Sequence, residues 1–244
     1  MAGYEHNRSA SHGRPGGHGG EDRDVLRLHG GTRRGLTELV FVVDESGSMY
    51  ELAGDTVGSF NATLERNRRL DGEANVSVVF FNDRPHVAVD RRPIEDVRPL
   101  GRRDYQPGGC TALLDALGGA ISHTAKVQAC QPDGYRAEHV VFVVITDGLE
   151  NASHRYGYGR VRRMVEGYRR QGWEFVFLGA NIDAAAEADQ LGIGRDHVAQ
   201  YVSDSDGMAL AYDAVAEATC AARDLGCVPA GWNDRVNADA RRRG

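Results

Sequence analysis

The sequence has one lysine, few cysteines and no long apolar run. Lys126 is the only lysine among 29 basic residues, so arginine carries nearly all of the positive charge. The formal net charge is −6, and the arginines are scattered among polar neighbours, which favours solvated surfaces over a nucleic-acid-binding face. No segment has the apolar length of a membrane span, and residues 1–20 lack the apolar stretch of a signal peptide.

The cysteines give no indication of a metal or disulfide framework. Cys110, Cys130, Cys220 and Cys227 form no CxxC pair and have no Cys/His spacing typical of zinc. In a chain of this length we expect them to be reduced thiols, buried or partly buried. Together with the missing signal peptide, this predicts a cytoplasmic protein.

One domain with a tail at each end is expected. Residues 1–36 are rich in Gly, His, Arg and Ser and lack apolar periodicity, which predicts a disordered N-terminal tail. Hydrophobic residues make up 41 % of the chain, enough for a sizeable core. The predicted domain spans residues 37–226, and residues 227–244 are expected to be a C-terminal tail.

Strands and helices alternate within this domain. Predicted strands are 39–43, 76–81, 86–89, 140–145, 173–178 and 197–202; predicted helices are 52–70, 111–129, 160–171, 184–191 and 206–225. The alternation predicts an α/β fold with a mostly parallel six-stranded sheet and helices on both faces. The turn at 82–85 is too short for a crossover, so strand 86–89 is expected to run antiparallel to its neighbour.

Oxygen-bearing side chains gather at the predicted strand ends. Asp44, Ser46 and Ser48 follow the apolar run 39–43 at alternate positions, Asp147 follows the apolar run 140–145, and Thr111 opens a helix. Ligands bind at the carboxyl ends of strands in open α/β sheets, where the strand order reverses. Hard divalent cations such as Mg²⁺ prefer oxygen ligands. These residues therefore form a candidate cation site.

These segments resemble those of the von Willebrand factor type A (VWA) domain. The stretches at 44–48, 109–113 and 145–148 match in order and approximate spacing the complete metal-ion-dependent adhesion site of that family, and the resemblance is to its bacterial intracellular type. It implies a Rossmann-like, doubly wound fold and a bound Mg²⁺ or Mn²⁺. It also implies that Ser46 and Ser48 are direct ligands, that Thr111 can engage or release, and that Asp44 and Asp147 often act through water. A partner protein commonly completes the shell with an Asp or Glu.

Three functions are compatible with such a site. The leading hypothesis is a metal-dependent protein-binding module without enzymatic activity. A metal-dependent hydrolase or phosphoryl-transfer enzyme is the alternative, with His154 and Glu150 as candidate bases, although the sequence has no HExxH, GxxxxGK[ST] or GxSxG motif. A third reading is a scaffold subunit in which the metal mainly stabilises the loops.

Overall fold

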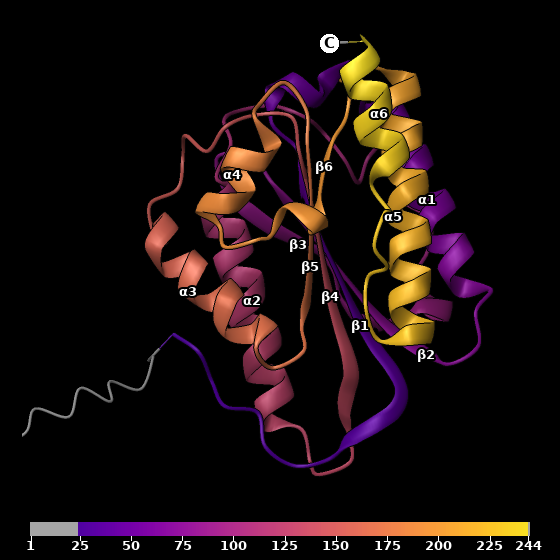
Figure 1. Ribbon diagram of the computed structural model, residues 1–244, viewed down its shortest axis with the longest axis vertical. Coiled ribbons are helices and arrows are strands. Elements are labelled where there is room, and N and C mark those ends of the chain that lie inside the picture. The colour runs from indigo at the N-terminus through magenta and orange to yellow at the C-terminus, as the bar shows by residue number, and fades with distance from the viewer. Residues whose placement is uncertain (1–23, 244) are drawn as a thin grey trace, which may run out of the picture.

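A six-stranded sheet in the order β3-β2-β1-β4-β5-β6 forms the centre of the structure, a computed structural model that describes residues 24–243 (Figure 1). Neighbouring strands are parallel except β3, which pairs antiparallel with β2 at one edge. The strands are β1 (Thr32–Asp44), β2 (Glu73–Phe81), β3 (Pro85–Pro93), β4 (Arg136–Thr146), β5 (Glu174–Gly179) and β6 (Val198–Gln200). The mostly parallel sheet with its antiparallel edge strand is confirmed.

Helices cover both faces of the sheet. They are α1 (Ala53–Arg68), α2 (Leu113–Cys130), α3 (Tyr158–Arg169), α4 (Ala184–Gln190), α5 (Ser205–Leu225) and α6 (Asp234–Arg243), with short 3-10 turns η1 (Gly47–Tyr50), η2 (Ile94–Asp96) and η3 (Arg195–His197). The layer of α1, α5 and α6 lies on one face, and α2, α3 and α4 lie on the other (Figure 1). Within residues 24–243, no helix combines the length and apolar character that a membrane crossing requires.

Strand β1 shows why the apolar runs are continuous. Leu39, Phe41 and Val43 pack into the core beneath α1 and α5, while Val40 and Val42 pack into the core beneath α2. A strand that is buried on both faces needs apolar residues at every position, and this is typical of parallel sheets. The residues at the carboxyl ends of these central strands are therefore buried from solvent.

Strands β1 and β4 begin several residues earlier than predicted. β1 extends back to Thr32, and β4 extends back to Arg136, which pairs with Thr32. Residues 32–34 are exposed, so this outer part of the ladder is held by backbone pairing and carries no apolar pattern. Apolar periodicity detects only the buried part of a strand.

Both ends of the chain differ from the predicted tails. Residues 1–23 of the predicted N-terminal tail lie outside the described residues, but 24–28 pack on α3, where Asp24 pairs with Arg160 and Arg163. At the other end, residues 234–243 form α6. Asn237 accepts a hydrogen bond from the backbone N–H of Gln200 at 2.8 Å, and Asn233 donates to the carbonyl of Val198 at 2.5 Å. Helix α6 thus occupies the free edge of β6.

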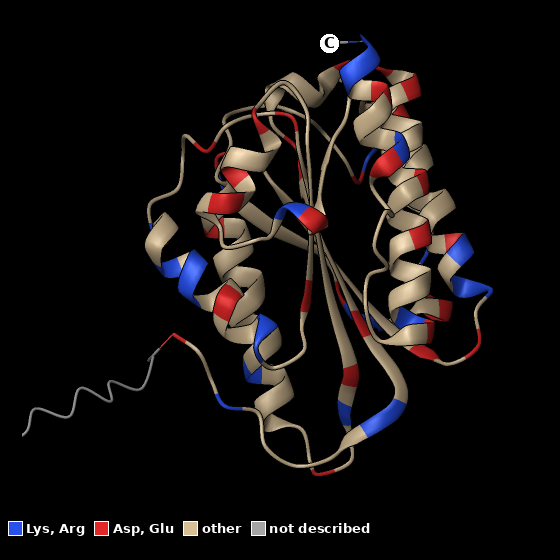
Figure 2. Cartoon of the chain, viewed as in Figure 1, with Lys and Arg blue, Asp and Glu red and all other residues tan. Residues whose placement is uncertain are grey.

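A charged network is buried on the face of the sheet that α2 covers. Glu38 is 0 % exposed and accepts hydrogen bonds from Arg91, Asn75 and Gln128. Arg91 adopts a left-handed conformation (φ 43°), which non-glycine residues rarely adopt. Elsewhere, acidic and basic residues are interspersed along the outer helices (Figure 2). Glu38 differs from these residues, since its charge lies inside the fold and is paired with Arg91.

The expectation for the cysteines was partly wrong. All four are free thiols, but Cys110, Cys130 and Cys227 are exposed and only Cys220 is partly buried. Cys110 lies in a loop, Cys130 is the last residue of α2, and Cys227 follows α5. Positions at the ends of elements are open to solvent, and this explains the difference.

Candidate functional site

Two carboxylates meet at the carboxyl edge of the sheet. Asp44 is the last residue of β1, and Asp147 directly follows β4, the parallel neighbour of β1. The exposed fractions of Asp44 and Asp147 are 0 % and 3 %. Asp44 Oδ1 accepts a hydrogen bond from the backbone N–H of Ser46 at 2.7 Å, and Asp44 Oδ2 accepts one from Thr146 Oγ1 at 2.6 Å. Both oxygens of Asp44 are therefore fixed in place.

The turn after β1 brings two hydroxyls to Asp147. The Ser46 and Ser48 hydroxyls lie 3.1 Å apart, and Ser48 Oγ donates to Asp147 Oδ1 at 2.5 Å. The second carboxylate oxygen, Asp147 Oδ2, is buried and has no hydrogen-bond partner within the described chain. A buried carboxylate oxygen without a partner is costly unless a cation or a donor occupies the space beside it.

Thr111 reaches the same place from the loop before α2. A Cβ atom added to Gly148 would lie 3.3 Å from Thr111 Oγ1, so the hydroxyl packs directly against the residue after Asp147. Thr111 is 3 % exposed. The structure thus links Asp44, Ser46, Ser48 and Asp147 by hydrogen bonds and places the Thr111 hydroxyl against Gly148, the neighbour of Asp147.

The loop after β4 holds Thr111 in position. Asn151 Oδ1 accepts a hydrogen bond from the Thr111 N–H at 2.8 Å, and the Asn151 N–H donates to the Thr111 carbonyl at 3.0 Å. Glu150 accepts hydrogen bonds from the backbone N–H groups of Leu114 and Ser153. Its carboxylate therefore caps the first turn of α2, where backbone N–H groups lack intrahelical partners.

Burial makes the site electrostatically strained without a counter-ion. Burial raises the pKa of Asp44 from 3.8 to about 6, against the hydrogen bonds from Thr146 and Ser46, and the nearby charge of Asp147 adds to the rise. Burial also raises the pKa of Asp147, against the hydrogen bond from Ser48. Two carboxylates in a dry setting disfavour the doubly charged state, which a bound cation would stabilise.

The donor set is made mainly of neutral oxygens. Within residues 24–243, no three His, Cys, Asp or Glu side chains gather into a group that could hold a metal. A cation at this site would therefore depend on the hydroxyls of Ser46, Ser48 and Thr111 as well as on the two carboxylates. Such an all-oxygen set suits a hard cation that retains water, and it fits the group that the resemblance implies.

Two supporting residues were missed in the sequence. Thr146 donates to Asp44, and the Tyr105 hydroxyl donates to the Asp44 carbonyl at 2.5 Å. Thr146 could have been found, because the predicted strands 39–43 and 140–145 end together and place it opposite Asp44. Tyr105 lies in an irregular segment, and no local pattern indicates its contact with β1.

Of the two candidate bases for an enzyme, one is hydrogen-bonded to α2 and the other is exposed. The carboxylate of Glu150 is engaged as a helix cap, and His154 is exposed, with its backbone N–H donating to Asp115. A general base must lie within hydrogen-bond reach of the proton it removes. Neither residue contacts the five side chains of the candidate site in any described hydrogen bond.

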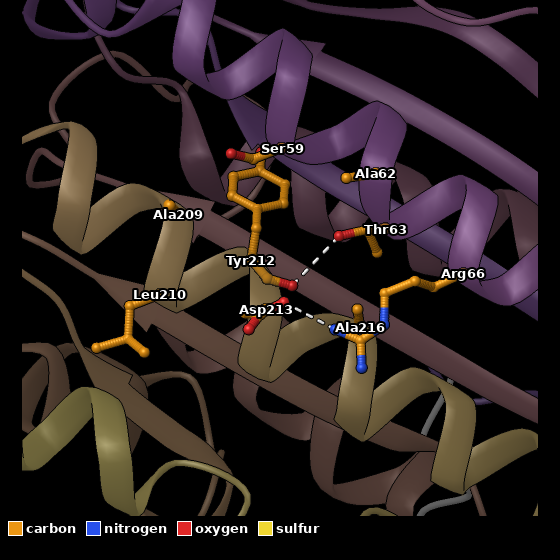
Figure 3. A pocket seen from close by; sticks show the side chains of 9 residues that line it. All are labelled: Ser59, Ala62, Thr63, Arg66, Ala209, Leu210, Tyr212, Asp213 and Ala216. Atoms are coloured by element: carbon orange, nitrogen blue, oxygen red, sulfur yellow. Dashed lines mark hydrogen bonds and ion pairs between the residues drawn. The ribbon is translucent and has the colours of Figure 1, made fainter.

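A pocket between two helices lies away from the candidate site. A groove of about 460 Å³ runs between α1 and α5, and its lining includes Ala62, Ala216 and the ion pair of Arg66 with Asp213 at 2.8 Å (Figure 3). None of the five site residues lines it. The groove is therefore separate from the candidate site at the edge of the sheet.

The fold and the site define a class of protein, the α/β domains that carry oxygen-bearing side chains at the carboxyl edge of a doubly wound sheet. The von Willebrand factor type A domain model matches residues 38–213, and the chain belongs to this family. Domains of the family are often metal-dependent adhesion or protein-binding modules. No curated protein matches the sequence.

Solved structures show the same fold at low sequence identity. The PilB minor pilin from Streptococcus sanguinis is 13% identical with a TM-score of 0.55, over 82% of this chain and 64% of the pilin. Proximal thread matrix protein 1 from the mussel byssus, with a zinc-occupied metal-ion-dependent adhesion site (MIDAS) motif, is 18% identical with a TM-score of 0.52. The match covers 78% of this chain and 46% of the mussel chain. A von Willebrand factor type A protein from Catenulispora acidiphila is 14% identical with a TM-score of 0.51, over 78% and 43%. The chain spans about half the length of the mussel proteins that it matches.

Proposed function

We propose that the protein is a non-enzymatic, metal-dependent binding module that captures an acidic group of a partner protein. The proposed ligand set is Asp44, Ser46, Ser48, Thr111 and Asp147, and the proposed ion is Mg²⁺ or Mn²⁺. The ion would supply a Lewis-acidic centre for a carboxylate of the partner. We further propose a cytoplasmic setting, in line with the free thiols.

One observation supports the ion most directly. Asp147 Oδ2 is buried without a described partner, while Asp147 Oδ1 is held by the Ser48 hydroxyl. A carboxylate with one oxygen bonded to the Ser48 hydroxyl and the other without a partner, near the Ser46 hydroxyl, is the arrangement expected where a cation supplies the missing contact. The zinc-occupied site of the mussel protein adds support, because that protein shares the fold.

The charge balance favours an acidic partner. With Asp44 and Asp147 acting through water, the direct protein ligands of the ion would be neutral hydroxyls, so the ion would stay electrophilic toward an added carboxylate. Ser48 is exposed, whereas Asp44, Ser46, Thr111 and Asp147 are buried. The site is therefore approachable from the side of Ser48, which leaves room for one group from outside.

Titration with Mn²⁺ tests the ion. Isothermal titration of the chain should give one site, with affinity at least tenfold weaker in Asp44→Ala and in Ser48→Ala. Asp189→Ala is the matched control, because its side chain is 78% exposed on α4 and lies outside the site. Equal Mn²⁺ binding by all four proteins would refute the proposed ligand set.

Affinity capture then tests the partner. Proteins that are retained by the wild-type chain in Mg²⁺ should be released by EDTA and should not be retained by Asp44→Ala. Retention that survives both treatments would show that binding does not depend on the ion. Turnover of phosphoesters or peptides in the presence of Mn²⁺, abolished in His154→Ala, would favour the enzymatic alternative.

A further inference from the structure

Two exposed apolar side chains stand next to the candidate ligands. Six large apolar side chains are exposed within residues 24–243, among them Tyr50 at 73% and Leu149 at 57%. Tyr50 follows Ser48 by two positions, and Leu149 follows Asp147 by two positions. Single exposed apolar residues are ordinary, but these two lie on both segments that meet at the site.

Each of the two side chains is turned outward by an anchored neighbour. Met49 is 0 % exposed and packs in the core, so the turn η1 directs the adjacent Tyr50 to solvent. Glu150 turns inward to cap α2, which leaves Leu149 on the outside. Both apolar groups therefore sit on segments that the fold already holds in place, and a partner would lose little by ordering them.

The two positions lie within reach of one short segment of a partner. Consecutive Cα atoms are about 3.8 Å apart. The Cα atom of Tyr50 therefore lies less than about 8 Å from that of Ser48, and the same limit holds for Leu149 and Asp147. The ligands themselves touch, since Ser48 Oγ lies 2.5 Å from Asp147 Oδ1. An extended peptide advances about 3.3 Å per residue, so side chains one to three positions from its acid reach this distance.

We infer that the site selects a partner segment in which an Asp or Glu lies within three positions of a large apolar residue, with Tyr50 and Leu149 as the apolar contacts. This inference rests on the proposed function. The cation attracts any carboxylate, and the carboxylates of small metabolites are abundant, so charge alone distinguishes poorly among acids. Apolar contacts beside the ion add the selectivity, because they reward only an acid that carries a neighbouring apolar group.

A phage-displayed library of random peptides tests the inference. The library is bound to the immobilised chain in Mg²⁺ and eluted with EDTA. Eluted sequences should contain an Asp or Glu with Leu, Ile, Phe, Met, Tyr or Trp within three positions, enriched over the input library. Acidic sequences without apolar enrichment would overturn this inference and leave the proposed function standing. Elution without enrichment of acids would overturn both.

Variants then assign the contacts. Tyr50→Ser and Leu149→Ser should each bind a selected peptide about five- to tenfold more weakly, as expected when a half-exposed apolar side chain loses its buried contact. Leu225→Ser is the matched control, because Leu225 is also an exposed apolar residue, at 70%, but lies away from the site. It ends α5, and the next residue, Gly226, lies beside His139 in the first half of β4, whereas Asp147 follows the other end of that strand. Equal affinity of all four proteins for the peptide would overturn the assignment. It would also be overturned if Mg²⁺ no longer raised the melting temperature of Leu149→Ser, because the weaker binding would then come from damage to the ion site.

Discussion

Asp44→Asn should make the metal-free protein more stable. Asn can keep the hydrogen bond that Asp44 Oδ1 accepts from Ser46, since the amide retains one carbonyl oxygen. Its NH₂ group would replace Oδ2 and donate to Thr146 Oγ1, and the Thr146 hydroxyl can then donate to the Gly148 carbonyl at 3.0 Å. The substitution therefore removes a buried charge without leaving an unsatisfied polar atom.

The magnitude follows from the pKa of Asp44. Burial moves this pKa from 3.8 to about 6. At any pH above both pKa values, the folded state with ionised Asp44 is therefore about 3 kcal/mol less stable than it would be if the pKa of Asp44 had its ordinary value. Because the folded pKa is raised, the loss grows as pH rises from about 4 to about 6, and it disappears below about 4. In EDTA at pH 8, Asp44→Asn should gain up to about 3 kcal/mol, or about 6–12 °C in melting temperature for a chain of this size.

Urea denaturation in EDTA and in Mg²⁺ measures this gain. In EDTA the variant should unfold at higher urea than the wild type at pH 8, and the difference should shrink toward pH 4. In Mg²⁺ the wild type should gain stability and the variant should not, because the ion stabilises only a folded state that binds it. Asp189→Asn, an exposed carboxylate on α4, should behave like the wild type throughout.

Two results would refute the reasoning. If Asp44→Asn were less stable than the wild type in EDTA at pH 8, burial of the carboxylate would not be a net cost. If Mg²⁺ stabilised the variant as much as the wild type, Asp44 would not be part of the ion's environment.

Three further predictions concern the supporting structure. Arg91→Ala should cost about 3–5 kcal/mol in urea denaturation, since it leaves Glu38 charged and buried without its ion-pair partner, and a loss below about 1 kcal/mol would contradict this. Gly148→Ala should weaken Mn²⁺ binding several-fold in titration, because the new methyl would press on Thr111 Oγ1 from 3.3 Å, and unchanged affinity would count against a role for that hydroxyl. The hydrogen bond between His197 and the Glu174 carboxylate raises the pKa of His197. The stability that this pair contributes should therefore be complete below about pH 6.5, and it should be lost as pH rises through the higher pKa of the folded state. A stability difference between the wild type and His197→Gln that does not change with pH would refute this.

The fold could be predicted because its central strands are buried on both faces. Continuous apolar runs such as 39–43 and 140–145 arise where helices cover both sides of a parallel sheet, and the polar residues that follow such runs must lie at its carboxyl edge. That reasoning was enough to place Asp44 and Asp147 at one edge. It did not place Tyr105, because a contact between a loop and a strand end depends on the whole path of the chain.

Helix α6 shows the opposite case. Only Val236 is fully buried in it, and the helix carries arginines at its last three positions, so it has little apolar stripe to detect. It is held to β6 through Asn233 and Asn237, whose amides contact backbone groups of the strand. A helix that docks by polar contacts leaves no periodic signal in the sequence, and for this reason the segment resembled a tail.

This docking has a consequence for the sheet as a whole. β6 is a three-residue strand whose outer backbone groups have no strand partner. The side-chain amides of Asn233, just before α6, and Asn237, within α6, bind these groups. A chain shortened to end at Gly226 would leave Val198 and Gln200 as a bare template for pairing with a second molecule. The final helix thus covers the β6 edge of the sheet against pairing with another strand. The opposite edge strand, β3, carries prolines and charged residues, which also disfavour such pairing.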